Sequence, residues 1–188
     1  MKFAIHTLGC KVNQYESSAL SDLLVSRGYT YTDDSAEADI FIINSCTVTE
    51  NSDKKAKQSV GHYKRSRPNG IAVLTGCYPQ AFPDEAAQSG ADIITGAADR
   101  GKIPDRIEQF LSEGGKITAV TPQTGSYEEF LSANTGKTRA FVKIEDGCDR
   151  FCSYCIIPYA RGRVRSRSLD DVNKEIQAQA LAGHREVV

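Results

Sequence analysis

The stretch Asp39-Ile40-Phe41-Ile42-Ile43-Asn44 decides the fold class of this chain. An apolar run of this length between polar residues is typical of a β-strand. Comparable runs recur at residues 2–7, 71–75, 93–95 and 117–120. Amphipathic stretches with helical spacing separate them, at residues 13–27, 49–66, 80–89 and 98–112. This alternation predicts an α/β fold in which an open parallel sheet has helices on its flanks.

Two local signals mark the ends of the first helix. Asn13 and Glu16 have the spacing of a capping box, in which each side chain bonds a backbone N–H of the other residue. Gly28 stands where a helix C-terminus favours a residue in the left-handed conformation. We therefore expect this helix to begin near Asn13 and to end just before Gly28.

The alternation stops at residues 121–138, which are rich in Thr, Ser, Gly and acidic residues. We interpret them as a linker after an N-terminal domain at residues 1–120. A second unit at residues 139–188 has a strand-like start, a cysteine loop, a helix capped by Ser168, and the first residues of another strand. This strand–helix–strand start is expected to be the first unit of an α/β barrel that is cut short. The chain is then a fragment of a longer protein.

Composition excludes few classes of protein. The chain has 188 residues, 40% of them hydrophobic and 25% charged, with a formal net charge of -1. No apolar run approaches the roughly 18 to 20 residues needed to cross a bilayer, and the start has no signal-peptide pattern. We therefore expect a cytoplasmic protein, and nothing in the sequence indicates a membrane or a stable protein partner. In that reducing compartment the six cysteines are metal ligands or reactive thiols more often than disulfides.

Three cysteines lie close together in the second unit, with the spacing Cys148-x3-Cys152-x2-Cys155. Thiolates suit iron–sulfur clusters or zinc. A structural zinc site normally has four protein ligands, and the nearest further candidate, His184, lies beyond the helix. Three ligands on a four-iron cluster leave one iron open for chemistry. The sequence favours the cluster, with an incomplete zinc site as the alternative.

The other three cysteines are far apart, but each follows an apolar run by a short step. Cys10, Cys46 and Cys77 come after the strands expected at residues 2–7, 39–44 and 71–75. In a parallel sheet the three thiols would meet at the carboxyl edge, where open α/β folds place ligand sites. We therefore expect a second cluster held by three thiolates, with buried core cysteines or a redox pair as the alternatives.

Four arginines follow the cysteine loop, and no acidic residue occurs from position 151 to 168. Arg161, Arg163, Arg165 and Arg167 are expected to form a positive lip that holds an RNA phosphate or a cofactor carboxylate. The alternatives are a solvated surface loop or arginines that pair with acids of the missing part of the barrel.

The cysteine motifs resemble one known family. The run Gly147-Cys148-Asp149-Arg150-Phe151-Cys152-Ser153-Tyr154-Cys155 is similar to the signature of radical S-adenosylmethionine (SAM) enzymes. Its continuation through Arg163, together with residues 7–17, 44–48 and 75–80, resembles the methylthiotransferases of that superfamily. The resemblance covers essentially the whole chain. It implies a truncated radical SAM barrel after the first domain, and a fragment that does not turn over.

The resemblance also implies cofactors, partners and roles. They are two 4Fe–4S clusters, SAM, tRNA and a low-potential electron donor, with Tyr154 beside the SAM adenine; the alternative for Tyr154 is an aromatic ring packed under the loop. From the charge of the arginine stretch we also expect Arg161 and Arg163 to bind the cofactor. The expected cluster ligands are Cys10, Cys46, Cys77, Cys148, Cys152 and Cys155.

Within this family the motifs look most like the branch that methylthiolates N6-threonylcarbamoyladenosine in tRNA. Other branches act on isopentenyladenosine in tRNA or on an aspartate of a ribosomal protein. A threonylcarbamoyl group carries a carboxylate that an arginine can bind, whereas an isopentenyl group is apolar. Two other classes stay open on the residues alone: an iron–sulfur electron-transfer module and a zinc-stabilised nucleic-acid-binding module.

Overall fold

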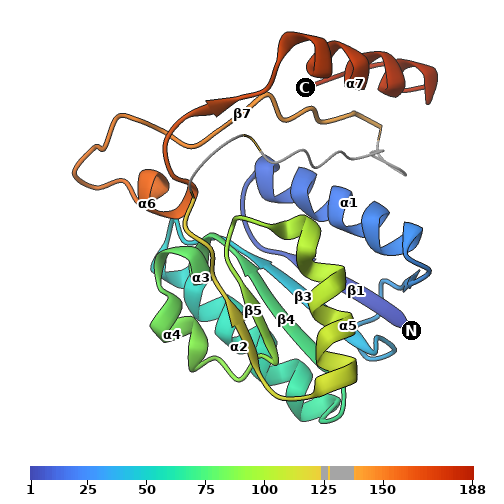
Figure 1. Cartoon of the computed structure of the whole chain (residues 1–188), viewed down its shortest axis with the longest axis vertical. Helices are drawn as coiled ribbons and strands as arrows, with labels where there is room; N and C mark the ends of the chain where they lie inside the picture. The colour runs from blue at the N-terminus through green and yellow to red at the C-terminus, as the bar shows by residue number, and fades with distance from the viewer. Residues whose placement is uncertain (124–126, 128–137) are drawn as a thin grey trace.

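A six-stranded sheet forms the centre of the molecule (Figure 1). This computed structural model describes residues 1–123, 127 and 138–188, so most of the linker expected at residues 121–138 lies outside the described residues. The strands are β1 (Lys2–Thr7), β2 (Thr30–Tyr31), β3 (Ile40–Ser45), β4 (Ile71–Gly76), β5 (Ile93–Thr95) and β6 (Ile117–Ala119).

All neighbouring strands of this sheet are parallel, in the order β2-β1-β3-β4-β5-β6. The α/β fold with an open parallel sheet is therefore confirmed. The short edge strand β2 was not expected, because two residues are too few for a recognisable apolar run. From β1 the chain adds β2 on one side, and from β3 it adds β4, β5 and β6 on the other side. The crevice between the carboxyl ends of β1 and β3 is the usual place for a ligand site in such sheets.

Helices cover both faces of the sheet (Figure 1). Because successive side chains of a strand point to opposite faces, Ile40 and Ile42 pack beneath α1 and α5, whereas Phe41 and Ile43 pack beneath α2, α3 and α4. Burial of each such side chain stabilises the fold by about 1.5–3 kcal/mol. The helices are α1 (Lys11–Ser26), α2 (Glu50–Ser66), α3 (Cys77–Ala81), α4 (Pro83–Ala87) and α5 (Ile103–Glu113).

Two expected helices are shorter or divided. The one expected at residues 80–89 is the pair α3 and α4, because Pro83 lacks an N–H and disfavours a helical conformation at Phe82. The one expected at residues 98–112 is a short 3-10 helix, η1 (Arg100–Lys102), followed by α5. None of the helices in the described part of the chain combines the length and hydropathy that a bilayer crossing needs.

The first helix confirms one expected terminus and corrects the other. Gly28 has φ +86°, and its N–H donates to Val25 O at 3.0 Å, as expected after a helix C-terminus. The capping box is wrong, because α1 begins directly after Cys10 and both Asn13 and Glu16 are buried inside it. Their polar groups are therefore available to the interior of the molecule.

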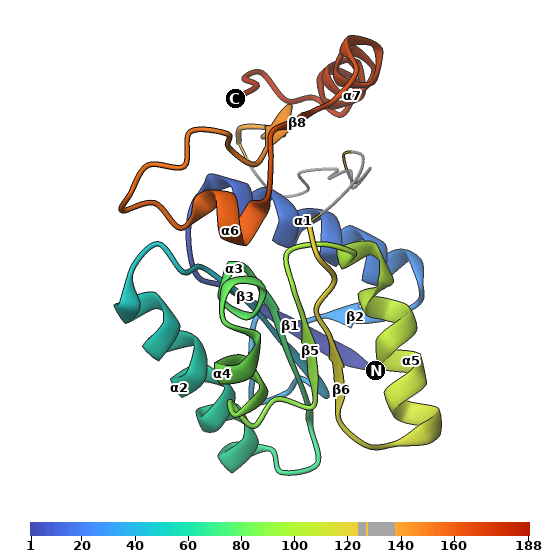
Figure 2. The same cartoon turned by 60° about the vertical axis from the view of Figure 1, so that its left-hand side comes forward.

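The C-terminal unit lies over the carboxyl edge of the sheet, with α6 above α3 (Figure 2). The strand expected at residues 139–144 is reduced to a parallel bridge between Ala140 and Val187, with N–H···O distances of 2.9 Å on either side. Ser168 caps the following helix as expected, accepting from Asp171 N. The elements are β7 (Glu145–Asp146), α6 (Ile157–Arg161), β8 (Arg165–Ser166) and α7 (Leu169–Leu181).

Candidate functional site

The three N-terminal cysteines stand at the carboxyl edge of the sheet. Cys10 immediately precedes α1 after β1, and Cys46 follows β3. Cys77 follows β4 and is the first residue of α3. Because Ser45 and Gly76 are register partners, Cys46 and Cys77 leave adjacent strands at the same level. The three strands end at one edge of the sheet, as expected, with Cys46 and Cys77 buried and Cys10 exposed. That the three thiols together hold a cluster stays a prediction.

A glycine allows the first two cysteine segments to approach each other. Gly9 has φ +138°, and a Cβ atom built there would lie 2.8 Å from the Cβ of Cys46 and 3.1 Å from Cγ of Asn13. Any larger residue would force the segments apart. Three soft sulfur donors on closely packed strand ends are a donor set that fits an iron–sulfur cluster.

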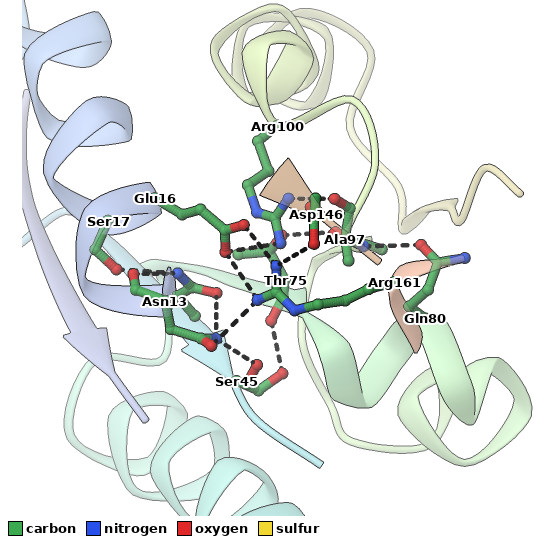
Figure 3. A network of polar contacts seen from close by, with 12 residues as sticks. Asn13, Glu16, Ser17, Ser45, Thr75, Gln80, Ala97, Arg100, Asp146 and Arg161 are labelled. Atoms are coloured by element: carbon green, nitrogen blue, oxygen red, sulfur yellow. Dashed lines mark hydrogen bonds and ion pairs between the residues drawn. The ribbon is translucent and has the colours of Figure 1, made fainter. Parts of the chain in front are cut away.

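Asn13 connects this edge through its buried side chain (Figure 3). Its Nδ2 donates to Ser45 O at 3.0 Å and to Asn44 Oδ1 at 3.3 Å. Its Oδ1 accepts from the Cys10 thiol at 3.2 Å. One amide thus fixes the Cys10 side chain relative to the strand that leads into Cys46.

The C-terminal cysteines lie in the loop between β7 and α6. Cys148 N–H donates to Gly162 O at 3.0 Å, which closes the base of the loop. Cys155 N–H donates to Cys152 O at 2.9 Å, so a turn brings these two residues together. Cys152 is exposed, and Cys148 and Cys155 are half-buried. Among the residues that the structure describes, no three Cys, His, Asp or Glu side chains are grouped as ligands of one metal ion.

Both cysteine segments border one cavity, of about 580 Å³. Tyr154 and Cys155 line one side of it. Thr47 and Val48, the two residues after Cys46, line another side together with the first turns of α2. Tyr154 is 90% exposed, so its ring is available to a bound molecule. Among the described lining residues Cys155 is the one cysteine, so the cavity adjoins the C-terminal cysteine loop and the segment that follows Cys46.

The four arginines do not form the expected lip. Arg163 is exposed, with its guanidinium 4.7 Å from the centre of the Phe151 ring. Arg161 and Arg167 are buried, and Arg165 donates to Arg161 O at 2.9 Å. The acidic partners of Arg161 and Arg167 were not recognised in the sequence. A contact of Arg161 or Arg163 with a cofactor stays a prediction.

Glu16 binds Arg100, Arg161 and Lys143 inside the molecule. Figure 3 shows the two arginines beside it. Its Oε1 lies 2.8 Å from both Lys143 Nζ and Arg161 Nη1, and its Oε2 lies 3.0 Å from Arg100 Nη2. Burial alone would raise the pKa of this carboxyl, but Arg100, Arg161 and Lys143 outweigh it and hold the pKa well below 4.5. Glu16 is therefore ionised and ties the C-terminal unit to α1.

The contacts of Glu16 were not predicted from the sequence, although one signal was present. Glu16, Leu20 and Leu24 are spaced at i, i+4 and i+8, so they share one stripe of α1, and all three are buried. An acidic residue in an apolar stripe needs a buried cationic partner. The pattern of α1 does not indicate which residue supplies this cationic partner.

A second polar contact joins the C-terminal unit to α1. Tyr15 donates its hydroxyl to Glu175 Oε1 of α7 at 3.0 Å. The other carboxylate oxygen of Glu175 pairs with Arg167, which also donates to Lys143 O at 3.2 Å. Glu16 and Tyr15 thus both join the unit to the first helix through buried charged and polar groups.

Comparisons with known proteins agree with the family resemblance that the sequence motifs indicate. Residues 2–96 match Uncharacterized protein family UPF0004. The chain is 43% identical to a threonylcarbamoyladenosine tRNA methylthiotransferase of Bacillus subtilis, over 98% of this chain and 42% of the relative. It is 34% identical to a protein of the same name from Aquifex aeolicus, over 100% of this chain and 47% of the relative.

A third relative carries a different name. It is a tRNA-2-methylthio-N(6)-dimethylallyladenosine synthase of Clostridium novyi, 38% identical over 99% of this chain and 43% of the relative. The chain thus spans less than half the length of each of these three curated relatives.

Proposed function

This chain belongs to the UPF0004 family, and from that premise we propose that it carries the cysteine sites of a tRNA methylthiotransferase. The proposed reaction converts N6-threonylcarbamoyladenosine next to the anticodon into its 2-methylthio derivative. This choice of substrate is supported by the sequence motifs and by the 43% identity to the Bacillus subtilis protein. The proposed location is the cytoplasm.

The observation that supports this proposal most is the cavity that both cysteine segments border. An electron carrier normally has all its irons ligated by protein and needs no space for a substrate. A zinc-stabilised binding module needs neither a cavity nor a second group of thiols. A cavity between the C-terminal cysteine loop, through Tyr154 and Cys155, and the segment that follows Cys46 suits an enzyme that binds a substrate or cofactor beside a metal site.

In the proposed enzyme two 4Fe–4S clusters are held by the two groups of cysteines. Cys148, Cys152 and Cys155 would hold the cluster that binds SAM, and Cys10, Cys46 and Cys77 the cluster that handles sulfur. Bound together, a cluster and SAM supply the one-electron chemistry that an adenine C–H bond requires, because that bond has no acidic proton for a base to remove.

The protein residues would bind and orient the reactants. Asn13 holds the Cys10 side chain in place. Tyr154 offers an exposed ring on which the adenine of SAM can stack. Arg163 offers an exposed guanidinium to an RNA phosphate or to the threonylcarbamoyl carboxylate. A low-potential electron donor completes the set of partners.

The substrate is tested in cells that lack the gene. Mass spectrometry of their tRNA nucleosides should show loss of the methylthio-threonylcarbamoyl nucleoside and an unchanged level of the methylthio-isopentenyl nucleoside. The gene supplied on a plasmid serves as the control and should restore the lost nucleoside. Loss of the isopentenyl derivative instead would assign the protein to the other branch, and no change in either would refute the proposed activity.

The two-cluster assignment predicts how iron is shared between the cysteine groups. Replacing Cys148, Cys152 and Cys155 together by alanine should remove about half of the iron bound after anaerobic reconstitution. The matched variant, with alanine at Cys10, Cys46 and Cys77, should lose the other half. Iron and sulfide analysis measures both. Loss of all iron in either variant would contradict two separate clusters, and a colourless protein containing zinc would favour the binding module.

A further inference from the structure

The loop between β7 and α6 stands out from the rest of the molecule (Figure 1 and Figure 2). Two aromatic side chains of this loop and one of α6 are exposed, Tyr154 by 90%, Phe151 by 42% and Tyr159 by 65%. Large aromatic side chains are mostly buried in folded proteins, because burial takes a wide apolar area out of water. Exposed rings that lie so close together are typical of a binding surface.

Two of these rings and an arginine are in contact, and the three residues Phe151, Tyr159 and Arg163 are called here the Phe151 patch. The rings of Phe151 and Tyr159 meet edge to face, with their centres 5.9 Å apart. The guanidinium of Arg163 lies over the Phe151 ring, 4.7 Å from its centre. The Arg163 side chain is nevertheless 73% exposed. The patch therefore holds a flat cationic group at the surface, against a ring that keeps it in place.

The backbone of Phe151 supports a functional role for this patch. Its φ is +45°, in the left-handed region that a bulky side chain rarely adopts. This conformation is unfavourable for an L-residue, so surrounding contacts must hold it. It places the ring of Phe151 where it contacts both Tyr159 and Arg163. Backbone strain at an exposed aromatic residue is a feature of binding segments, and a solvated loop has no need of it.

The exposed charges of this segment are mainly positive. Asp149 is the one acidic residue between positions 147 and 168. It lies 3.6 Å from Arg163, but both side chains are exposed, so this pair is weak and a stronger anion can replace it. Arg150 is exposed as well. Rings combined with arginines suit a single-stranded nucleic acid, whose bases stack on aromatic or guanidinium planes while its phosphates meet the cations.

We propose that the Phe151 patch binds unpaired bases of an RNA loop, with one base stacked on the guanidinium of Arg163. This inference rests on the proposed function, because a modified adenosine next to the anticodon lies in an unpaired loop of tRNA. The face of the guanidinium stacks, and its N–H groups remain able to bind a phosphate. The cysteine loop thereby contacts the RNA directly, in addition to holding thiols.

The test measures binding of the 188-residue chain to a fluorescein-labelled RNA hairpin with the sequence of an anticodon stem and loop. Fluorescence anisotropy gives the dissociation constant. Arg163→Lys keeps the charge but loses the flat group, and it should weaken binding about fivefold or more, the effect of one stacked base. Phe151→Leu keeps an apolar side chain but removes the ring beneath the guanidinium, and it should weaken binding by a similar factor.

Two controls separate stacking from attraction by charge. Tyr31→Leu also removes an exposed ring, on the edge strand β2, and should change the dissociation constant by less than about twofold. A fully paired RNA hides the faces of its bases, so Phe151→Leu should bind it as the parent does. Equal affinity of Arg163→Lys and the parent for the hairpin would overturn the inference, since the patch would then attract phosphates alone.

A second measurement needs no variant and therefore does not depend on how a variant folds. The hairpin carries 5-iodouridine in its loop, and ultraviolet light crosslinks this base to an aromatic side chain that it stacks on. Mass spectrometry of the digested complex should place the crosslink on the peptide that contains Phe151 or Tyr159. A crosslink elsewhere in the chain, or no binding of the hairpin by the parent, would overturn the inference.

The remaining outcomes separate this inference from its rival and from the proposed function. Self-association of the parent chain in sedimentation experiments, abolished in Phe151→Leu, would assign the patch to a protein contact and overturn the inference. A hairpin bound away from the patch, with the methylthio nucleoside still lost from cells that lack the gene, would overturn this inference alone. A hairpin bound at the patch, with unchanged nucleosides in those cells, would support this RNA contact and overturn the proposed reaction.

Discussion

Replacing Glu16 by alanine is expected to lower the free energy of unfolding by about 3–5 kcal/mol, because it leaves buried cations without their anion. The carboxylate is 1% exposed and pairs with Arg100, Lys143 and Arg161. Without it, Lys143 and Arg161 keep Asp146 as a partner, but each loses its contact with Glu16. Chemical denaturation at pH 7, followed by circular dichroism, measures the loss.

Glu108→Ala is the matched control for this loss. Glu108 is also a helical glutamate with an arginine partner, Arg27 at 3.6 Å, but both side chains are exposed. Exposed pairs contribute about 0–1 kcal/mol, so this variant should be close to the parent in stability. Similar losses in the two variants would show that burial of Glu16 does not matter, contrary to the structure.

The lowered pKa of Glu16 also predicts how the stability difference between the parent and Glu16→Ala depends on pH. A carboxyl whose pKa is lower in the folded state than in the unfolded state contributes its full stabilisation above the ordinary pKa of a glutamate, which is 4.5. The stabilisation disappears only as the pH falls through the folded pKa, which lies well below that value. The contribution of Glu16 should therefore be the same at pH 7 and pH 5. A smaller difference at pH 5 would mean that the cations do not hold the carboxyl ionised.

The sheet and the N-terminal cysteine edge could be predicted because their signals are local. Each strand is a short apolar run, and a cysteine soon after such a run must emerge at the carboxyl edge of a parallel sheet. The pair of Arg161 and Glu16 joins residues 145 positions apart, and neither residue has a local pattern that names the other. The same limit explains why four clustered arginines were expected on the surface. Sequence spacing alone does not reveal which charges are paired across the fold.

Buried ion pairs at this interface have a consequence for how the two units meet. An apolar interface tolerates sliding, because its attraction is non-directional. A carboxylate shared by several cations is satisfied only in a narrow range of positions, since each lost contact leaves a buried charge. The pair of Arg161 and Glu16 therefore fixes where the helix after Cys155 stands relative to the helix after Cys10. In the proposed enzyme, where both cysteine sites act on one substrate, such a fixed separation would keep the reactants in position.

Replacing Gly76 by alanine is the second change with a large expected effect, a loss of about 2–5 kcal/mol in the free energy of unfolding. Gly76 has φ +101° and ψ -155°, a region that is essentially open to glycine alone. A Cβ atom there would collide with the backbone oxygen of Ser45 and lie 2.8 Å from its nitrogen. Backbone of the central strand β3 cannot move aside cheaply. Denaturant unfolding of the apo chain measures the loss.

Gly28→Ala separates strain from collision. Gly28 also has positive φ, at +86°, but a Cβ atom there meets nothing within 4 Å. Only the left-handed conformation opposes that variant, so it should lose about 1–2 kcal/mol. The excess loss at Gly76 then measures how tightly the strand ends before Cys46 and Cys77 are packed. Because that collision pushes the two segments apart, Gly76→Ala should also reduce iron binding at the N-terminal cysteines, while Gly28→Ala should leave it intact. Equal losses of stability, or full iron binding in Gly76→Ala, would contradict close packing as the basis of this site.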